Sequence, residues 1–240
     1  MAAKYAGQVT FVSENFGASK LAERYGAKGY PVVFVDDVLV AAPRDFGHFG
    51  EVEGKGRYAP WRDAGNQAKF KADLTRMVDL ILAGRKDVVS REHADASAGL
   101  KEIATLPKFT LSDLSGRAIT ADQLAGRAVL VEFWATWCTP CRSTLAWLGE
   151  LKQKYGDNLA ILALAVESPA DQIRSTAGSY SPGLRWAITD AATAGAFGDI
   201  TSVPTTFLFD REGRAARVFY GAPPDLHEQV GKVLEELTRW

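Results

Sequence analysis

The chain has 240 residues, of which 47% are hydrophobic, and its 28 basic residues nearly balance 29 acidic ones. This composition is typical of a globular protein of one or two domains, and a net charge of −1 gives no reason to expect a nucleic-acid partner. No apolar run approaches the length of a membrane span, so we expect no stable membrane insertion. The first residues, MAAKYAGQVTF, lack a basic region followed by an apolar one, so we expect no signal peptide in this chain.

The first 83 residues have mixed helix and strand patterns. Apolar periodicity between turn-forming residues predicts several short elements and one longer helix. These are a strand over Gln8–Ser13, a helix over Ala18–Tyr25, a hairpin of Val32–Val35 with Val38–Ala41, and a helix over Asn66–Leu82. Between the hairpin and the last helix, glycine, proline and charge dominate residues 43–65, which predicts a long surface loop.

Residues 84–104 are predicted to be a linker. They are mostly charged or small and have no apolar stripe before Leu100. His93 lies in this stretch, and we assign no role to a lone linker histidine. The expected division of the chain is therefore a first region over 1–83, the linker, and a second domain over 105–240.

The second region has the pattern of an α/β domain. A strand, helix and strand followed by a hairpin and a closing helix predict a central mixed sheet with helices on both sides. The predicted elements are a hairpin of Phe109–Leu111 with Ala118–Thr120, a turn at Asp122–Leu124, a strand from Val129, a helix over Thr139–Tyr155, a strand over Leu159–Val166, a helix capped by Ser168, strands over Trp186–Thr189, Thr205–Phe209 and Ala215–Tyr220, and a helix over Asp225–Thr238. His227 is expected on the solvent face of that last helix.

The only two cysteines lie in VLVEFWATWCTPCR, residues 129–142. An apolar strand leads to Cys138 at the start of a helix, where free backbone N–H groups and the helix dipole favour a thiolate, so Cys138 is the expected nucleophile. Cys141 follows on the same face of the first turn, so the two sulfurs can form a disulfide that another thiolate reopens. Pro140 suits the first turn, and Trp137 is expected to place its ring beside an exposed Cys138 sulfur.

This pattern predicts dithiol exchange with protein disulfides or dithiols and with an upstream thiol-disulfide partner, and it needs no metal or organic cofactor. Half of a zinc site is a weaker interpretation, because zinc takes four ligands and the chain adds only His48, His93 and His227, far apart in sequence. A structural disulfide is also weaker, because such a bond stabilises less as the loop that it closes shortens.

WCTPC after VLVEFWAT, the lead-in FTLSDLSGRAITADQLAGRAV and the later SVPTTFLFDREGR resemble the TlpA/ResA type of thiol-disulfide oxidoreductase in the thioredoxin superfamily. The resemblance covers Leu106 to Trp240 and implies a thioredoxin-like α/β fold. It implies that Pro204 is a cis-proline facing the cysteine pair across a groove. It also implies that Val203 presents backbone groups to an extended substrate, as in strand addition.

The same resemblance bears on the direction and place of the reaction. Thr139 and Pro140 set the redox poise, and a proline beside the second cysteine resembles the reducing members, so we expect a reductase. Together with Trp137, Val203 and Pro204, these two residues are the expected substrate-binding residues. Family members commonly work outside the cytoplasm, so we expect a periplasmic or other extracytoplasmic location and a targeting segment that is left out of this chain.

Two acids are candidates for proton transfer at Cys141. Glu132 lies in an apolar run six residues before Cys138 and matches the buried aspartate of thioredoxin. Burial raises the pKa of a carboxyl group, which makes Glu132 a plausible acceptor of the Cys141 proton. The alternative interpretation is that Glu132 is a buried acid with no role in catalysis. Glu167 is the rival, because the ES pair after the next strand matches a buried glutamate of the ResA type; its alternative is an exposed charge near a helix start.

KYAGQVTFVSENFGASKLAERYGAKGYPVVFVDDVLV, near the N-terminus, resembles the second half of a thioredoxin, with Pro31 at the cis-proline position. The strand and helix that would carry a cysteine pair are missing, so this region performs no dithiol exchange as given. Either the natural protein is longer, or the half-domain completes its sheet in another way. The region is then either a docking or substrate-presenting platform or an inert, truncated fold.

Two other functions stay open. A peroxidase of the peroxiredoxin type shares the fold and the FTLSD opening, but Val131 and Ala135 stand where its proline and its threonine or serine usually precede the cysteine. A binding protein, in which the cysteines only regulate contact with a partner, is the second. Such a protein would fail to turn over with insulin or a mixed disulfide.

Overall fold

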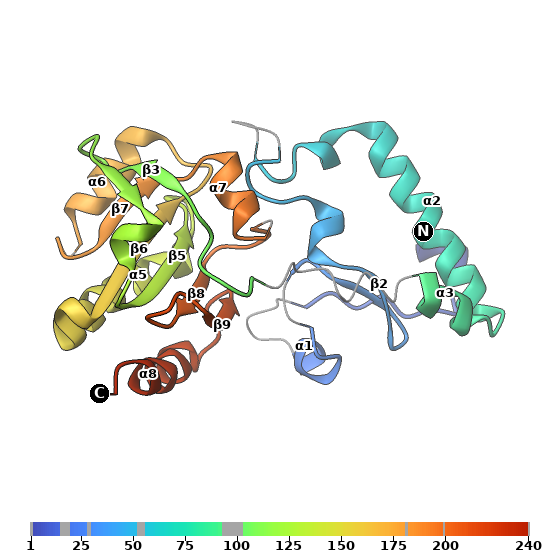
Figure 1. The fold of residues 1–240 in the computed structure, drawn as a ribbon. Coiled ribbons are helices and arrows are strands. Elements are labelled where there is room, and N and C mark those ends of the chain that lie inside the picture. The colour runs from blue at the N-terminus through green and yellow to red at the C-terminus, as the bar shows by residue number, and fades with distance from the viewer. Residues whose placement is uncertain are drawn as a thin grey trace.

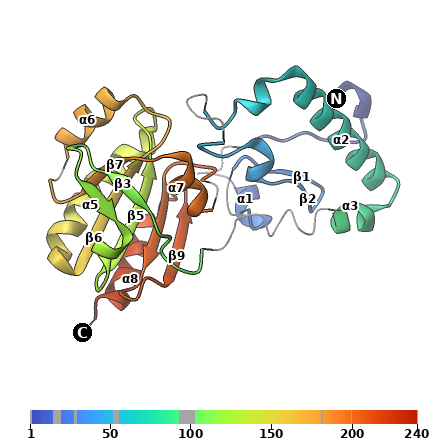
Figure 2. The ribbon, with the colours of Figure 1, turned by 45° about the horizontal axis from the view of Figure 1, so that its top comes forward.

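The computed structural model describes residues 2–14, 20–27, 30–51, 56–92, 103–180, 182–198 and 200–239 of the chain. The helices and strands form two lobes, the first made of elements before residue 93 and the second of elements after residue 103 (Figures 1 and 2). Among the described residues, no helix is long and apolar enough to cross a membrane. The second lobe holds both cysteines.

A five-stranded sheet forms the centre of the second lobe, in the order β7-β6-β5-β8-β9. The three parallel strands are β5 (Ala128–Trp134), β6 (Leu159–Ala165) and β7 (Arg185–Ile188). β8 (Thr205–Phe209) runs antiparallel to β5, and β9 (Ala215–Tyr220) runs antiparallel to β8. Every residue of β5, β6 and β8 is buried, as expected for strands that are covered on both faces. The predicted central mixed sheet is confirmed.

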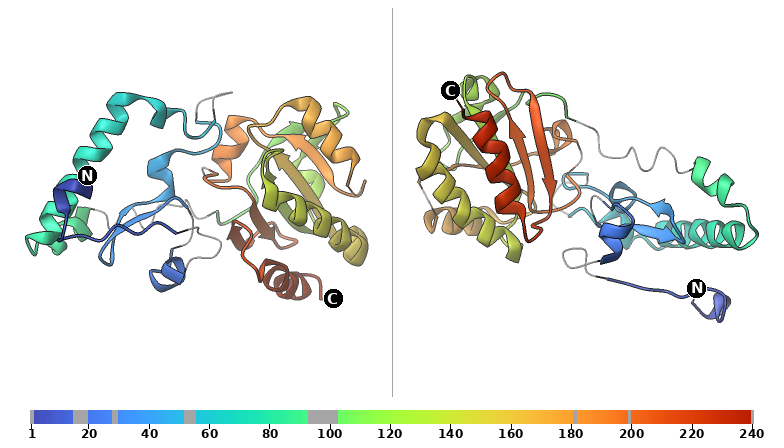
Figure 3. Two further views of the ribbon diagram at one scale, coloured as in Figure 1. Left: turned by 180° about the vertical axis from the view of Figure 1, so that it is seen from behind. Right: turned by 90° about the horizontal axis from the view of Figure 1, so that it is seen from below.

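Three helices cover one face of this sheet: α5 (Thr139–Tyr155), α6 (Ala170–Gly178) and α8 (Leu226–Leu237). Since crossovers between parallel strands are right-handed, the successive steps from β5 to β6 and from β6 to β7 put α5 and α6 on the same face. α8 lies beside α5, and an ion pair between Lys154 and Glu235 at 3.5 Å joins them (Figure 3). The active-site helix is thus held between two neighbours.

The opposite face carries α7 (Ala191–Ala196) and the hairpin of β3 (Thr110–Ser112) with β4 (Ala118–Thr120), followed by a 3-10 turn at Ala121–Leu124. Phe197, directly after α7, packs edge-on against Phe133 of β5 and contacts Phe109, which precedes β3. α7 lies on the side of the second lobe that faces the first lobe (Figures 1 and 2).

The first lobe consists of α1 (Lys20–Arg24), the hairpin of β1 (Val33–Val35) with β2 (Val38–Ala41), α2 (Ala64–Leu82) and α3 (Lys86–Glu92). Short 3-10 turns occur at Ala2–Tyr5, Pro43–Phe46 and Pro60–Arg62. The lobe has a small apolar core of its own, formed by buried Val38, Val40, Met77 and Val89. The predicted hairpin is confirmed, and the peptide between Tyr30 and Pro31 is cis. The division into a half-thioredoxin region, a linker and a second domain stays a prediction, apart from the residues of α3 that lie within the expected linker.

Two predictions for the first lobe are wrong. Gln8–Ser13 forms no strand, and the described sheet of this lobe consists of β1 and β2 alone. The expected linker contains α3. Val89 on this two-turn helix is fully buried and belongs to the apolar core of the first lobe. Ala18 and His93 lie outside the described residues.

One prediction for the second lobe is also wrong, and one of its helices was not predicted. Ser168 does not cap α6, because its hydroxyl donates to Val166 O and accepts from Thr136 N–H while Pro169 takes the N-cap position. His227 is exposed on α8, as predicted, although its ring stacks on Trp147 with centroids 4.0 Å apart and partial burial lowers its pKa. α7 was not predicted, because AATAGA has no apolar stripe and its start depends on Asp190, which accepts from Thr193 N–H.

Candidate active site

Cys138 and Cys141 are joined by a disulfide at the first turn of α5. Cys138 is the N-cap residue, and its sulfur accepts a hydrogen bond from the backbone N–H of Cys141 at 3.2 Å. The N-cap position directs the positive end of the helix dipole at this sulfur, which favours its thiolate in the reduced chain. Cys138 is 4% exposed and Cys141 is fully buried. The expected exposed sulfur is therefore wrong, although Cys138 is the more accessible of the two.

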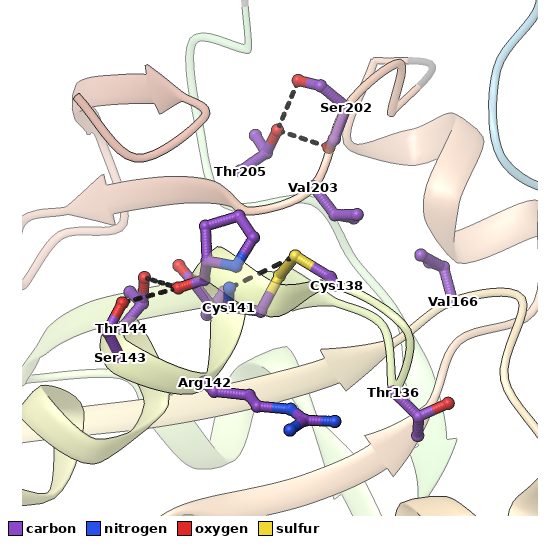
Figure 4. Close-up of a disulfide and its surroundings, with 12 residues drawn as sticks. Thr136, Cys138, Cys141, Arg142, Ser143, Thr144, Val166, Ser202, Val203 and Thr205 are labelled. Atoms are coloured by element: carbon purple, nitrogen blue, oxygen red, sulfur yellow. Dashed lines mark hydrogen bonds between the residues drawn. A yellow bond between two sulfur atoms is a disulfide. The ribbon is translucent and has the colours of Figure 1, made fainter. Parts of the chain in front are cut away.

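The turn before β8 covers the disulfide. The peptide between Val203 and Pro204 is cis, at the position that the resemblance implies. In the view of Figure 4, the side chain of Val203 lies above the disulfide and to one side of it, and Val166 lies further toward the edge of the site. Both valines are buried, as is Cys138 itself. The hydroxyl of Thr205 donates to Ser202 O at 2.8 Å and ties the turn together.

The exposed first turn of α5 lies on the solvent side of the disulfide. Thr139 and Pro140 are both exposed, and Pro140 O accepts hydrogen bonds from the hydroxyls of Ser143 and Thr144. Trp137 is 57% exposed, and its indole N–H donates to Glu167 O at 2.9 Å. This bond orients the Trp137 ring toward the first lobe, where Phe49 lies 6.1 Å away between ring centroids.

Glu132 is fully buried in the middle of β5. It pairs in register with Thr206 of β8, whose hydroxyl donates to Glu132 Oε2, and Oε1 has no hydrogen-bond partner among the described residues. Burial raises the pKa of this carboxyl from 4.5 to about 8, against the opposing effect of the Thr206 hydrogen bond. A carboxyl group with this pKa gains and loses a proton close to neutral pH.

Glu132 lies on the same face of the sheet as the cysteine pair. Side chains alternate along a strand, so Glu132 and Trp134 project to one face of β5. Trp134 and Cys141 line a common cavity of about 220 Å³, together with Arg142, Leu145 and Tyr180. The acid, the buried cysteine and α5 are therefore on one side of the central strand.

Glu167 has a different environment. Its backbone is left-handed, with φ +44°, and its side chain is only partly buried. Its carboxylate is directed toward the first lobe, since a Cβ built on Gly56 would lie 4.0 Å from Glu167 Oε2. Glu167 also lines a second groove, of about 440 Å³, with Val166, Ile188 and Gly50. Of the two candidate acids, only Glu132 is buried in the sheet.

Sequence reasoning missed three residues at this site. Thr206, the partner of Glu132, was missed because the sequence does not give the register in which β8 pairs with β5. Tyr30, whose hydroxyl donates to Val203 O, and Phe49, whose ring lies near Trp137, were missed because contacts between residues more than 80 positions apart leave no local pattern.

Comparison with known proteins places this site in a family. The AhpC/TSA family model matches residues 104–219. The chain is 32% identical over 124 residues to the thioredoxin-like protein YneN of Bacillus subtilis (strain 168), spanning 50% of this chain and 72% of that protein. It is 33% identical over 122 residues to the thiol-disulfide oxidoreductase ResA of Geobacillus thermodenitrificans (strain NG80-2), spanning 49% of this chain and 68% of that ResA. The chain belongs to the TlpA/ResA type of the thioredoxin superfamily.

The fold comparison agrees with this membership. A thiol:disulfide interchange protein of the thioredoxin family from Chlorobium tepidum TLS superposes with a TM-score of 0.52 at 21% identity, covering 57% of this chain and 98% of that one. At that identity the likeness shows the fold alone. As a TlpA/ResA-type protein, the chain is a thiol-disulfide oxidoreductase with a CxxC redox site, and its family implies protein disulfide substrates and redox partners.

Proposed function

We propose that this oxidoreductase reduces protein disulfides, with Cys138 as the attacking thiolate and Cys141 as the resolving one. The observation that carries the proposal is the position of the cysteine pair at the N-terminus of α5, beside the cis peptide of Val203 and Pro204. The helix end favours the thiolate of Cys138, and the turn offers backbone groups to an extended substrate.

The exchange has two steps. The Cys138 thiolate attacks one sulfur of the substrate disulfide, forms a mixed disulfide with it and releases the other sulfur as a thiolate. Cys141 then loses its proton, and its thiolate attacks the sulfur of Cys138, which closes the disulfide of the chain and releases the second substrate thiolate. Two electrons pass from the dithiol to the substrate, and an upstream dithiol partner of the same chemistry returns the chain to its reduced form.

Glu132 is the proposed acceptor of the Cys141 proton. Burial keeps its pKa near 8, so its carboxylate fraction at neutral pH can take a proton from a buried thiol and later return it. Glu167 has the weaker claim, because its carboxylate is directed toward Gly56 in the first lobe. Trp137, Thr139, Pro140, Val203 and Pro204 form the surface that we propose contacts the substrate around the reacting sulfur.

A periplasmic or other extracytoplasmic location goes with this proposal. Disulfide chemistry of this kind is needed mostly in oxidising compartments, where protein disulfides form and persist. Cell fractionation of the natural host, with a cytoplasmic and a periplasmic marker enzyme, is the direct measurement. Recovery of the protein with the cytoplasmic marker contradicts this location.

The reduction potential of the cysteine pair tests the proposed direction. We expect a value near that of thioredoxin, roughly −270 mV, because a reductant must hold its electrons less tightly than its substrates do. The measurement is equilibration of the protein in dithiothreitol or glutathione redox buffers, followed by quantification of free thiol. A value nearer the roughly −120 mV of a strong oxidant makes the chain a disulfide donor and contradicts the proposal.

A further inference from the structure

The first lobe contacts the cis-proline turn of the second through Tyr30. The hydroxyl of Tyr30 donates a hydrogen bond to Val203 O at 3.2 Å. The edge of the same ring lies close to Gly221 at the end of β9, since a Cβ built there would be 3.9 Å from Tyr30 Cε1. Burial is the main cause that raises the pKa of Tyr30, and the nearby Tyr58 raises it further. The phenol therefore keeps its proton and stays a hydrogen-bond donor.

A second contact comes from Phe49, which is 5% exposed and belongs to the apolar cluster of the second lobe. Its backbone N–H donates to Ile200 O at 2.7 Å, and its ring faces Trp137. Gly50 next to it has φ +87° and lies against α7, where a Cβ would come within 3.0 Å of Ala191 Cα. The close approach at this point therefore requires glycine.

Arg57 supports Phe49 from within the first lobe. Arg57 is 3% exposed, and its guanidinium group donates to Gly47 O and Pro43 O at 3.0 Å each and lies over the Phe49 ring at 5.8 Å. A buried cation that bridges two carbonyl groups rigidifies the loop that carries the phenylalanine. Phe49 is thus held in place from both lobes.

We infer that Tyr30 and Phe49 determine substrate specificity by occupying the surface that an extended substrate needs. The Tyr30 hydroxyl takes the place at Val203 O that a main-chain N–H of the substrate would take in strand addition. Phe49 meanwhile covers one side of Trp137. An extended polypeptide must displace the Tyr30 hydrogen bond before it pairs with the turn, whereas a small disulfide needs no such pairing. This inference rests on the proposed function, because it concerns access to the same cysteine pair.

The variant Tyr30→Phe tests the inference, because it removes the hydroxyl and keeps the ring. With the pre-reduced chain, we measure the peptide concentration that gives the half-maximal rate. We expect this concentration to fall about fivefold, because one net hydrogen bond contributes about 1 kcal/mol and 1 kcal/mol corresponds to about that factor. The substrate is an extended peptide with one internal disulfide, and the reaction is followed by tryptophan fluorescence. The rate with hydroxyethyl disulfide, a small disulfide, and the reduction potential should stay at the wild-type values.

Two comparisons make the result specific. Tyr25→Phe is the matched control, since it removes a phenol hydroxyl from the same lobe, where the Tyr25 ring stacks on Phe34 at 5.1 Å, and it should behave as the wild type. Gly50→Ala should shift the peptide concentration in the same direction as Tyr30→Phe, because its Cβ pushes the segment away from Ala191. A higher or unchanged concentration for Tyr30→Phe overturns the inference and, if higher, makes Tyr30 part of a substrate platform.

Binding without chemistry separates this inference from the proposed function. A serine version of the peptide, which carries no disulfide, is titrated calorimetrically into the oxidised chain and into its Tyr30→Phe variant. About fivefold tighter binding to the variant supports the inference even if the wild type turns over no peptide, a result that would contradict only the proposed function. Equal binding to both chains overturns the inference whatever the turnover.

Discussion

Cys138→Ser is expected to abolish disulfide reduction, with a loss of more than about a thousandfold, because a serine hydroxyl stays protonated where a thiolate must attack. Cys141→Ser should also stop turnover but for a different reason. Its Cys138 still attacks the substrate, and no second thiolate is present to resolve the product. One substrate molecule should therefore remain bound to each chain through a mixed disulfide.

Insulin reduction measures the loss, and mass spectrometry of the unreduced protein measures the mixed disulfide. The assignment rests on accessibility and on the helix end, since Cys138 keeps some exposure at the N-cap and Cys141 is fully buried. Ser143→Ala is the control and should keep activity, because it removes an exposed hydroxyl two residues after Cys141 on the same helix. If Cys138→Ser accumulates the adduct and Cys141→Ser does not, the two roles are reversed.

Glu132→Gln is expected to remove most of the pH dependence of stability between about pH 4.5 and 8. The pKa of Glu132 is about 8 in the folded chain, whereas a solvent-exposed glutamate, as in the unfolded chain, has a pKa of 4.5. Between these two pH values the folded chain therefore keeps a proton that the unfolded chain releases. The contribution of Glu132 is then fully present below pH 4.5 and is lost as the pH rises through 8. The free energy of unfolding falls by up to about 5 kcal/mol over this range.

Urea unfolding of the disulfide form at pH 5, 6.5 and 8.5 measures this slope. Glutamine has nearly the same shape, and its carbonyl group can still accept from the Thr206 hydroxyl, so the fold should persist. Above pH 8 the variant should be the more stable chain, because it buries no charge. Glu167→Gln is the matched control and should keep the wild-type slope, since Glu132 is still present. An unchanged slope in Glu132→Gln contradicts the buried, proton-holding carboxyl.

The same pair of variants ranks the two acids in the reaction. A positioned proton acceptor contributes about a hundredfold or more to a rate, so Glu132→Gln should slow resolution of the mixed disulfide by about that factor. Glu167→Gln should slow it much less, because the Glu167 side chain is directed toward the first lobe. If Glu167→Gln slows resolution as much as Glu132→Gln, Glu132 is not the principal acceptor.

Local patterns in the sequence were enough to predict most of the second lobe. The run of apolar residues at β6, the two cysteines three apart and the proline that opens β8 are each defined by neighbours in the chain. The bounds predicted for α5 and β8 agree with the structure for the same reason. Family membership followed from the residues around the cysteines and the cis-proline, which lie in this lobe.

Tertiary structure decided the contacts that no local pattern carries. Glu132 acquires its raised pKa only because both faces of the sheet are covered and Thr206 is its single hydrogen-bonding neighbour in the described chain. The His227 ring stacks on Trp147 only because α5 lies beside α8. The hydrogen bond from Tyr30 to Val203 joins residues 173 positions apart, so nothing in the sequence around either one predicts it. Residue type and periodicity determine which elements form, whereas burial and access at the cysteine pair depend on how distant elements pack together.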